Sequence, residues 1–98
     1  MNKKPQSKRE LVRVPYEQNV LINGALRVQA IDLSEGGLYL HTGRSFPSNS
    51  VVEVSFPLFH ETLSVQAVVR FSHEGVGMGL MFKALNDQQK ALVRRYIT

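Results

Sequence analysis

The chain has 98 residues, of which 43% are hydrophobic and 20% charged, with no cysteine and a formal net charge of +4. This composition is typical of one globular domain and excludes a disulfide scaffold, a thiolate metal site and a wholly disordered chain. No apolar run approaches the roughly 20 residues of a membrane-spanning helix, and the basic start MNKKPQSKRE has no apolar signal-peptide stretch after it, so we expect a cytoplasmic protein without membrane insertion.

The positive charge lies at the N-terminus. The first thirteen residues contain five Lys or Arg and one Glu, whereas the seven Lys or Arg that follow are balanced by seven Asp or Glu. Residues 1–10 have almost no apolar side chain to pack, so we predict a flexible basic arm before a folded domain over residues 11–98. A double-stranded nucleic-acid binder would spread basic residues over its folded surface. The pattern favours a small anionic ligand or a short single strand held by one segment, and no DNA partner is expected.

Strand patterns follow the arm. Asn23 and Gly24 lie between two short apolar segments and predict a β-hairpin. Later segments alternate apolar and polar residues with the period of a strand: 38–42, 51–56, 63–71 and 76–82. In the last of these, Gly77 and Gly79 occupy the face opposite the apolar residues, where a backbone or a ligand could approach closely. Strand packing is the commoner reason for such glycines.

The pattern becomes helical near the C-terminus. Asn86 is placed to cap a helix, and Gln89 stands at the capping-box position. The apolar residues that follow form one stripe at helical spacing: Leu92, Val93, Tyr96 and Ile97. Six short strands and one amphipathic helix predict an all-β fold, a small antiparallel barrel or sandwich whose helix covers an edge or an open end.

The stretch DLSEGG, which begins at Asp32, ends a predicted strand with an acid, a hydroxyl and two glycines. Asp32 and Ser34 are two apart, so on extended backbone they share a face. Because an unpaired buried carboxylate is costly, we predict that both point outward, that Ile31 and Leu33 face the core, and that a bulge near Ala30 sets this register. The glycines would allow positive φ and a close backbone approach. A simple Asx or Ser turn is the alternative, and both roles can coexist.

A second pattern, RELVR, places Arg9 and Arg13 on one face, whether the segment is helical or extended. Guanidinium groups suit phosphate oxygens and the O6/N7 edge of guanine. Asp32 complements the second target, because guanine presents N1 and N2 donors that a carboxylate can accept, whereas adenine has no such pair. Together the two patterns describe a receptor for a guanine-containing anion. Without the second pattern, the two arginines would more simply be interpreted as ordinary solvated charges of the arm.

In this order, Arg9-x-x-x-Arg13 followed by Asp32-x-Ser34-x-x-Gly37 resembles the RxxxR and D/NxSxxG signatures of the PilZ domain, a bacterial receptor family for cyclic di-GMP. The similarity includes Val-Pro after the second arginine, the glycine-rich last strand and the terminal helix, and it covers nearly the whole chain. The resemblance implies a six-stranded antiparallel β-barrel with a C-terminal helix. The arm would fold over cyclic di-GMP on the outer surface of the barrel.

The resemblance also implies the ligand-binding residues, which are Lys8, Arg9, Arg13, Asp32, Ser34 and Gly37. The two arginines would contact guanine edges and phosphates, the acid and the serine would hydrogen-bond guanine, and the glycine would supply backbone geometry. Lys8 stands where many members carry another arginine. It keeps the charge but lacks the planar fork that stacks on a base, and the stoichiometry, one or two ligands per chain, stays open.

The resulting hypothesis is a stand-alone cyclic di-GMP receptor, a monomer or weak dimer, with no catalytic activity, metal or cofactor. Arm closure would signal to a protein partner that controls motility, attachment or polysaccharide production. Two alternatives remain. A small barrel could bind single-stranded nucleic acid through its arm, although the sequence shows no evident aromatic stacking ladder. A PilZ-like adaptor could act through protein contacts only, although such members lack the arginines found here.

Enzyme and metal sites have little support in the sequence. The histidines His41, His60 and His73 are widely spaced and have no partner at metal-ligand spacing. Ser34 lies in no Gly-x-Ser-x-Gly context, so a hydrolase triad is not indicated.

Overall fold

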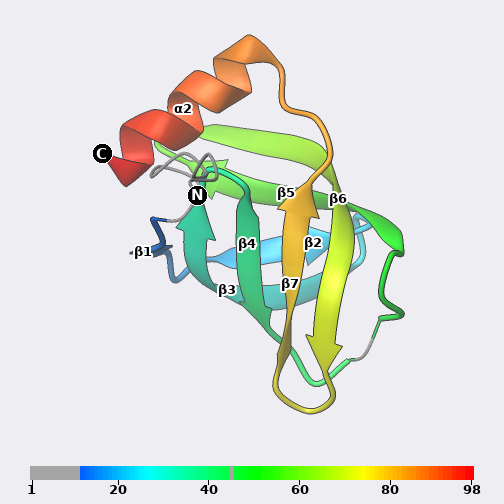
Figure 1. Cartoon of the computed structure of the whole chain (residues 1–98). Helices are drawn as coiled ribbons and strands as arrows, with labels where there is room; N and C mark the ends of the chain where they lie inside the picture. The colour runs from blue at the N-terminus through cyan, green and yellow to red at the C-terminus, as the bar shows by residue number, and fades with distance from the viewer. Residues whose placement is uncertain (1–11, 45) are drawn as a thin grey trace, which may run out of the picture.

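The computed structural model describes residues 12–44 and 46–98, which form an antiparallel β-barrel with a helix across one end (Figure 1). The strands in this part of the chain are β1 (Val14–Pro15), β2 (Asn19–Ile22), β3 (Leu26–Ser34), β4 (Gly37–His41), β5 (Val51–Leu58), β6 (Glu61–His73) and β7 (Gly77–Phe82). The helix α2 covers Asp87–Ile97. The helix lies over the end of the barrel at which β3 turns into β4.

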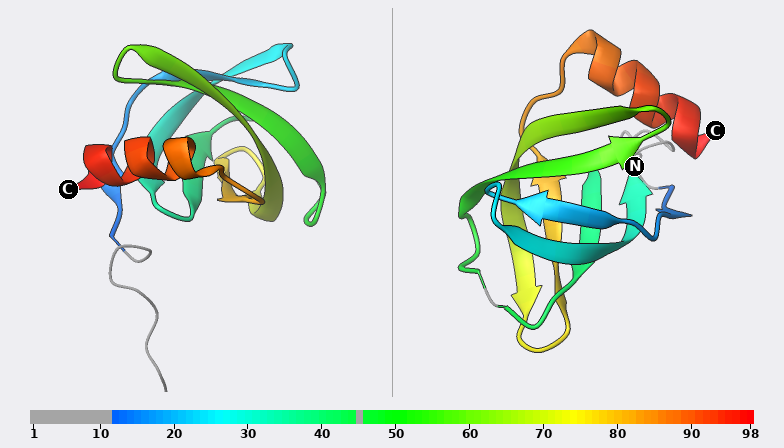
Figure 2. Two further views of the ribbon diagram at one scale, coloured as in Figure 1. Left: turned by 90° about the horizontal axis from the view of Figure 1, so that it is seen from above. Right: turned by 180° about the vertical axis from the view of Figure 1, so that it is seen from behind.

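The strand order is β1-β3-β2-β5-β6-β7-β4, and an additional β3–β4 pairing closes the sheet. The six strands β2 to β7 therefore form the barrel, which confirms the predicted six-stranded antiparallel architecture, and closure leaves them without a free edge. The short β1 is an extra strand that the alternation did not predict. It pairs with β3 alone, Val14 opposite Leu33 and Pro15 opposite Asp32. Figure 2 shows the closed sheet from above and from behind.

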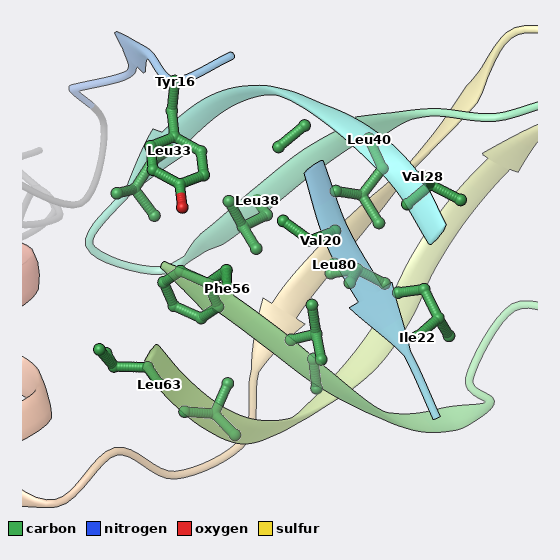
Figure 3. Close-up of a cluster of buried hydrophobic side chains, with 14 of the residues drawn as sticks. Tyr16, Val20, Ile22, Val28, Leu33, Leu38, Leu40, Phe56, Leu63 and Leu80 are labelled. Carbon is green, nitrogen blue, oxygen red and sulfur yellow. The ribbon is translucent and has the colours of Figure 1, made fainter. Parts of the chain in front are cut away.

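The core fills the barrel with the inward-facing residues of every long strand (Figure 3). Phe56 is fully buried and stacks on Phe82, with ring centroids 5.7 Å apart. At the helix end, Leu92 and Val93 are buried and pack onto this cluster. The alternation of apolar residues along the strands and the helical stripe thus meet in one core, as the patterning predicted.

The helix α2 begins at a complete capping box. The side chain of Asn86 accepts a hydrogen bond from the Gln89 backbone N–H at 2.8 Å, and the Gln89 side chain accepts one from the Asn86 N–H at 3.0 Å. The predicted cap is therefore confirmed, and it satisfies two N–H groups that a helix start leaves unpaired. No helix within the described residues is long and apolar enough to cross a membrane.

A bulge on β3 decides which side chains reach the outer surface. The register with β4 shifts between Ala30 and Asp32, as predicted. Ala30 and Leu33 are both buried, so the two residues between them lie toward the outside. The predicted direction of Leu33 is confirmed, but that of Ile31 is wrong, because its side chain is 37% exposed. An extra residue in a bulge has no direction set by strand period.

Tyr16 joins the first strand, the barrel and the helix. Its hydroxyl donates a hydrogen bond to the Pro57 carbonyl, and its ring packs edge-on against Phe56 and Tyr96 with centroids 6.2 and 5.5 Å away. The Tyr96 hydroxyl in turn donates to the Pro15 carbonyl at 3.2 Å. Burial raises the pKa of Tyr16 well above its ordinary value, and neighbouring Tyr96 raises it further.

The raised pKa of Tyr16 gives the fold a dependence on alkaline pH. The protonated hydroxyl contributes fully below the unfolded pKa of about 10, and that contribution is lost as pH rises toward the folded-state pKa. Tyr16→Phe should lower the free energy of unfolding by about 1 kcal/mol at neutral pH, the value of one hydrogen bond. Urea titrations should show that the variant loses less stability than wild type above about pH 10. Parallel losses in both proteins would contradict this role.

Candidate functional site

The structure brings Arg13 and Asp32 together on the outer surface of the barrel. Arg13 directly precedes β1, and the pairing of β1 with β3 places it beside β3. The bulge on β3 turns Asp32 outward. Nη1 of Arg13 donates to Oδ1 of Asp32 at 2.6 Å, with side chains 48% and 27% exposed. An ion pair this exposed contributes only about 0–1 kcal/mol to stability. The fold therefore does not depend on it, and both groups are free to exchange it for contacts with a ligand.

Ser34 is directed into the turn. It is 2% exposed, and its Oγ accepts hydrogen bonds from the backbone N–H groups of Gly36 and Gly37, both at 3.2 Å. The prediction that Ser34 points outward with Asp32 is therefore wrong. The Ser turn named as the simpler alternative is present, because the hydroxyl accepts from the backbone N–H groups two and three residues further along the chain. Direct contact of Ser34 with a ligand stays a prediction.

Gly37 is required by the close approach of β7. A Cβ added there would lie 1.8 Å from the Leu80 carbonyl oxygen, a distance that no side chain could accommodate. The predicted close approach is confirmed at Gly37, but the predicted positive φ is wrong. In the parts of the chain with described backbone, glycines with positive φ occur only at Gly24 and Gly75. The Gly36 carbonyl also accepts a hydrogen bond from the Phe82 N–H at 2.8 Å, which fastens the turn to β7.

The same turn is tied to the helix α2. Nε of Arg94 donates to Oε2 of Glu35, which lies within the turn. Between the turn, the end of β7 and the helix is an open cleft of about 690 Å³. Lys83 and Lys90 line it together with this ion pair, so the cleft is net positive. The turn itself lines the basic cleft through Glu35 and Gly36, while Asp32 lies on β3 just before the turn.

Two glycines of β7 lie beneath aromatic side chains of neighbouring strands. A Cβ on Gly79 would be 2.5 Å from the Phe71 ring, and one on Gly77 would be 2.8 Å from the Tyr39 hydroxyl. This packing agrees with the commoner explanation for such glycines. The covering rings could not be predicted from the sequence, since they come from different strands and only the pairing register makes them neighbours.

Lys8 and Arg9 lie outside the described residues, as does the predicted arm over residues 1–10, and their ligand contacts stay predictions. Within residues 12–44 and 46–98, no group of three or more His, Cys, Asp or Glu side chains is arranged to hold a metal ion. Of the six predicted site residues, the structure brings Arg13 and Asp32 into contact and places Ser34 and Gly37 in the adjoining turn.

Comparisons with known proteins agree with the barrel fold. The family model of the PilZ domain matches residues 3–98. The Bacillus subtilis Inhibitor of motility, MotI/DgrA, is similar with a TM-score of 0.76 and 20% identity, over 88% of this chain and 47% of that chain. The PilZ domain of CeSA from a cellulose synthesizing bacterium has a TM-score of 0.62 and 24% identity, over 87% and 93% of the two chains. These identities establish likeness of fold, and the chain spans about half the length of MotI/DgrA. A search of curated proteins found no match.

The two glycines of the turn provide a matched pair of variants. Gly37→Ala should lower the free energy of unfolding by about 1 to 3 kcal/mol or more, because its methyl group would collide with the backbone of β7. Gly36→Ala should be tolerated, since the nearest atom to an added Cβ is 3.9 Å away. Urea denaturation of both variants measures the difference. Equal free energies of unfolding for the two variants would show that β4 and β7 can move apart at Gly37 without loss of stability.

Proposed function

The chain belongs to the PilZ domain family, whose model matches residues 3–98, and from this membership we propose that it is a cyclic di-GMP receptor without catalytic activity. The observation that carries the proposal is the contact between Arg13 and Asp32 on the outer face. A guanidinium and a carboxylate, half-exposed and adjacent, offer the donor and acceptor sets that guanine requires.

Recognition would proceed by exchange of partners. Asp32 would release Arg13 and accept from N1–H and N2–H of a guanine, while the guanidinium fork would turn to the O6/N7 edge or to a phosphate. Asp32 would exchange its ion pair for two hydrogen bonds from guanine, and Arg13 would exchange it for the guanine edge or a phosphate, so neither charge would be left buried and unpaired. Adenine lacks the pair of donors that Asp32 accepts, which supports selectivity for guanine.

The basic arm would supply the remaining contacts. Five of the twelve Lys and Arg residues fall within the first thirteen positions, and we assign Lys8 and Arg9 to the phosphates and the second guanine edge. Residues 1–10 carry little apolar surface, so the ligand would have to order them. Ser34 and Gly37 would act chiefly by holding the turn that presents Asp32, with the arm closing over the anion.

A protein partner would respond to the ligand-bound form by recognising the closed arm and the barrel together. The Inhibitor of motility MotI/DgrA shares this fold, which supports a role in motility control. The CeSA PilZ domain comes from a cellulose synthesizing bacterium and supports polysaccharide production as the other candidate output. A cytoplasmic location, a monomeric or weakly dimeric state and independence from any cofactor complete the proposal.

A surface for single-stranded nucleic acid is the second candidate function. The observation in its favour is the presence of aromatic rings on the outer face next to Asp32, because unstacked bases bind such rings. The body of the chain beyond Arg13 is formally neutral, however, and gives little charge to follow a phosphate backbone.

Titration calorimetry should show saturable binding of cyclic di-GMP and none of cyclic di-AMP at matched concentrations. Asp32→Ala should weaken cyclic di-GMP binding by about 1 to 3 kcal/mol, the scale of a charge-assisted hydrogen bond, and leave the circular dichroism unchanged. Glu53→Ala, which removes an exposed acid from β5, is the control and should bind like wild type. Equal affinity for the two dinucleotides would contradict guanine recognition by Asp32.

Arginine variants test the other half of the pair. Arg13→Ala should abolish measurable binding of cyclic di-GMP, and Arg9→Ala should weaken it strongly. Arg13→Lys should also be impaired because an ammonium cannot form the planar bidentate contact. The control is Arg27→Ala, an exposed arginine on the same strand as Asp32 but toward its other end. Binding by Arg13→Ala at wild-type affinity would assign the ligand to another surface.

A further inference from the structure

The cleft beside α2 is a second surface of this chain, separate from the Arg13–Asp32 pair. It is lined by the turn between β3 and β4, the end of β7, the segment that joins β7 to α2, and one side of the helix. Figure 1 shows that segment running from β7 to α2 at the end of the barrel that the helix covers. The cleft volume of about 690 Å³ is within the range of protein binding sites. Among the described residues that line it, none belongs to the predicted cyclic di-GMP site.

Positive charge gathers in this cleft although the body of the chain is formally neutral. After Arg13 the chain has seven Lys or Arg and seven Asp or Glu, and the cleft is lined by three of these cations but only one of these acids. The cations are Lys83, Lys90 and Arg94, and the last two are about one helical turn apart on α2. Within residues 12–44 and 46–98, neither lysine has an ion-pair partner. Both lysines are exposed, so they can bind anionic groups that arrive from solvent.

A carboxylate already binds a cation in this cleft. Glu35 comes from the turn, has a side chain that is 11% exposed, and accepts a hydrogen bond from the Arg94 guanidinium. The two lysines can form the same kind of pair with carboxylates from another molecule. The start of α2 offers no further place for an anion, since the capping box of Asn86 occupies it and the acidic Asp87 follows.

Apolar side chains lie among these charges. Met81 is 39% exposed, Phe82 and Leu85 are partly buried against the core, and all three line the cleft. A small inorganic anion would use only the charges and would leave the apolar area uncovered. A peptide that carries both carboxylates and an apolar side chain can use both, because burial of apolar area adds to exposed ion pairs that are individually weak. The mixture therefore favours an acidic peptide over a small anion.

The chain itself has no segment of this kind. Its N-terminal arm is basic, so a positive cleft would repel it. The eight acids of the chain are scattered, and no two of them are adjacent in the sequence, so a second copy has no acidic run to insert. The occupant that fits is a different protein.

We propose that this cleft docks an acidic segment of a partner protein, with carboxylates on Lys83 and Lys90 and an apolar side chain against Met81 and Leu85. The inference rests on the proposed function in one respect, that the receptor acts through a protein partner, and it adds the surface and the chemistry of that contact. Glu35 limits the affinity, because its carboxylate occupies Arg94 and repels an incoming acid.

Selection from a random peptide library displayed on phage, with the whole chain as bait, identifies the chemistry that the cleft binds. Selected peptides should be rich in Asp and Glu and contain a large apolar residue. In fluorescence polarisation, the double variant Lys83→Gln, Lys90→Gln should bind such a peptide roughly five- to 30-fold more weakly, the value of two exposed ion pairs. Arginine at both positions keeps the charges and should retain binding. Arg27→Gln, which removes an exposed cation of β3, is the matched control and should bind like wild type.

A change at Glu35 should have the opposite effect on peptide affinity. Glu35→Gln removes the acid but keeps the size of the side chain, so Arg94 becomes a third cation for the peptide, and binding should tighten roughly two- to five-fold. If Glu35 served only to hold the turn, no gain would occur. Glu53→Gln, which removes an exposed acid of β5, is the control and should leave the affinity unchanged. Thermal unfolding followed by circular dichroism verifies that the variants are folded before their affinities are compared.

The outcomes separate peptide docking from cyclic di-GMP binding. A selection without enrichment, selected peptides without acids, or equal peptide binding by the double glutamine variant would overturn the docking site. If that variant lost cyclic di-GMP binding as strongly as peptide binding, the cleft would belong to the nucleotide, and the docking site would also be overturned. If wild type binds the peptide through the two lysines but fails to bind cyclic di-GMP, the receptor proposal fails and the docking site stands.

Discussion

The close contact between β4 and β7 is the constraint on which the rest of this structure depends. β4 pairs with β3 on one side and with β7 on the other, so the barrel closes only if both neighbours fit. At Gly37 the Leu80 carbonyl occupies the space that any side chain would need. The adjacent Gly36 carbonyl accepts from Phe82, and Glu35 pairs with Arg94 of the helix. The turn between β3 and β4 is thereby held by β7 on one side and by the helix α2 on the other.

The residues of the D-x-S-x-x-G motif have two different roles. Ser34 and Gly37 form the turn beside β7, whereas Asp32 is the residue that we propose for ligand binding. Ser34 and Gly37 are buried and shape the turn, and the bulge upstream turns Asp32 outward toward Arg13. An acid held by an exposed ion pair costs the fold little when that pair is exchanged. The motif can therefore place an exposed carboxylate at a defined position while Ser34 and Gly37 form the turn beside it. Under the proposed receptor function, only Asp32 of the motif would therefore need to touch the ligand.

Local chemistry explains what could be predicted from the sequence. The Asn23-Gly24 hairpin, the strand alternation and the Asn86 capping box depend on neighbours in the chain, and all three agree with the structure. The errors arose where direction depends on distant partners. The exposed Ile31 and the buried Ser34 follow from the bulge and the turn, where strand period no longer applies. The rings of Tyr39 and Phe71 are far apart in the sequence and become neighbours only through pairing with β7, which is why no stacking ladder was evident.

We propose that cyclic di-GMP binds the outer face of the barrel at the Arg13–Asp32 pair, where β3 and β4 meet. Amide chemical-shift mapping of the isotope-labelled protein during titration with cyclic di-GMP tests this claim most directly. We expect the largest shifts at Arg13, Asp32, Tyr39 and Gly79, together with the turn between β3 and β4, while the outward residues of β2 and β5 stay unchanged. Shifts confined to β2 and β5, or to the basic cleft beside α2, would contradict it.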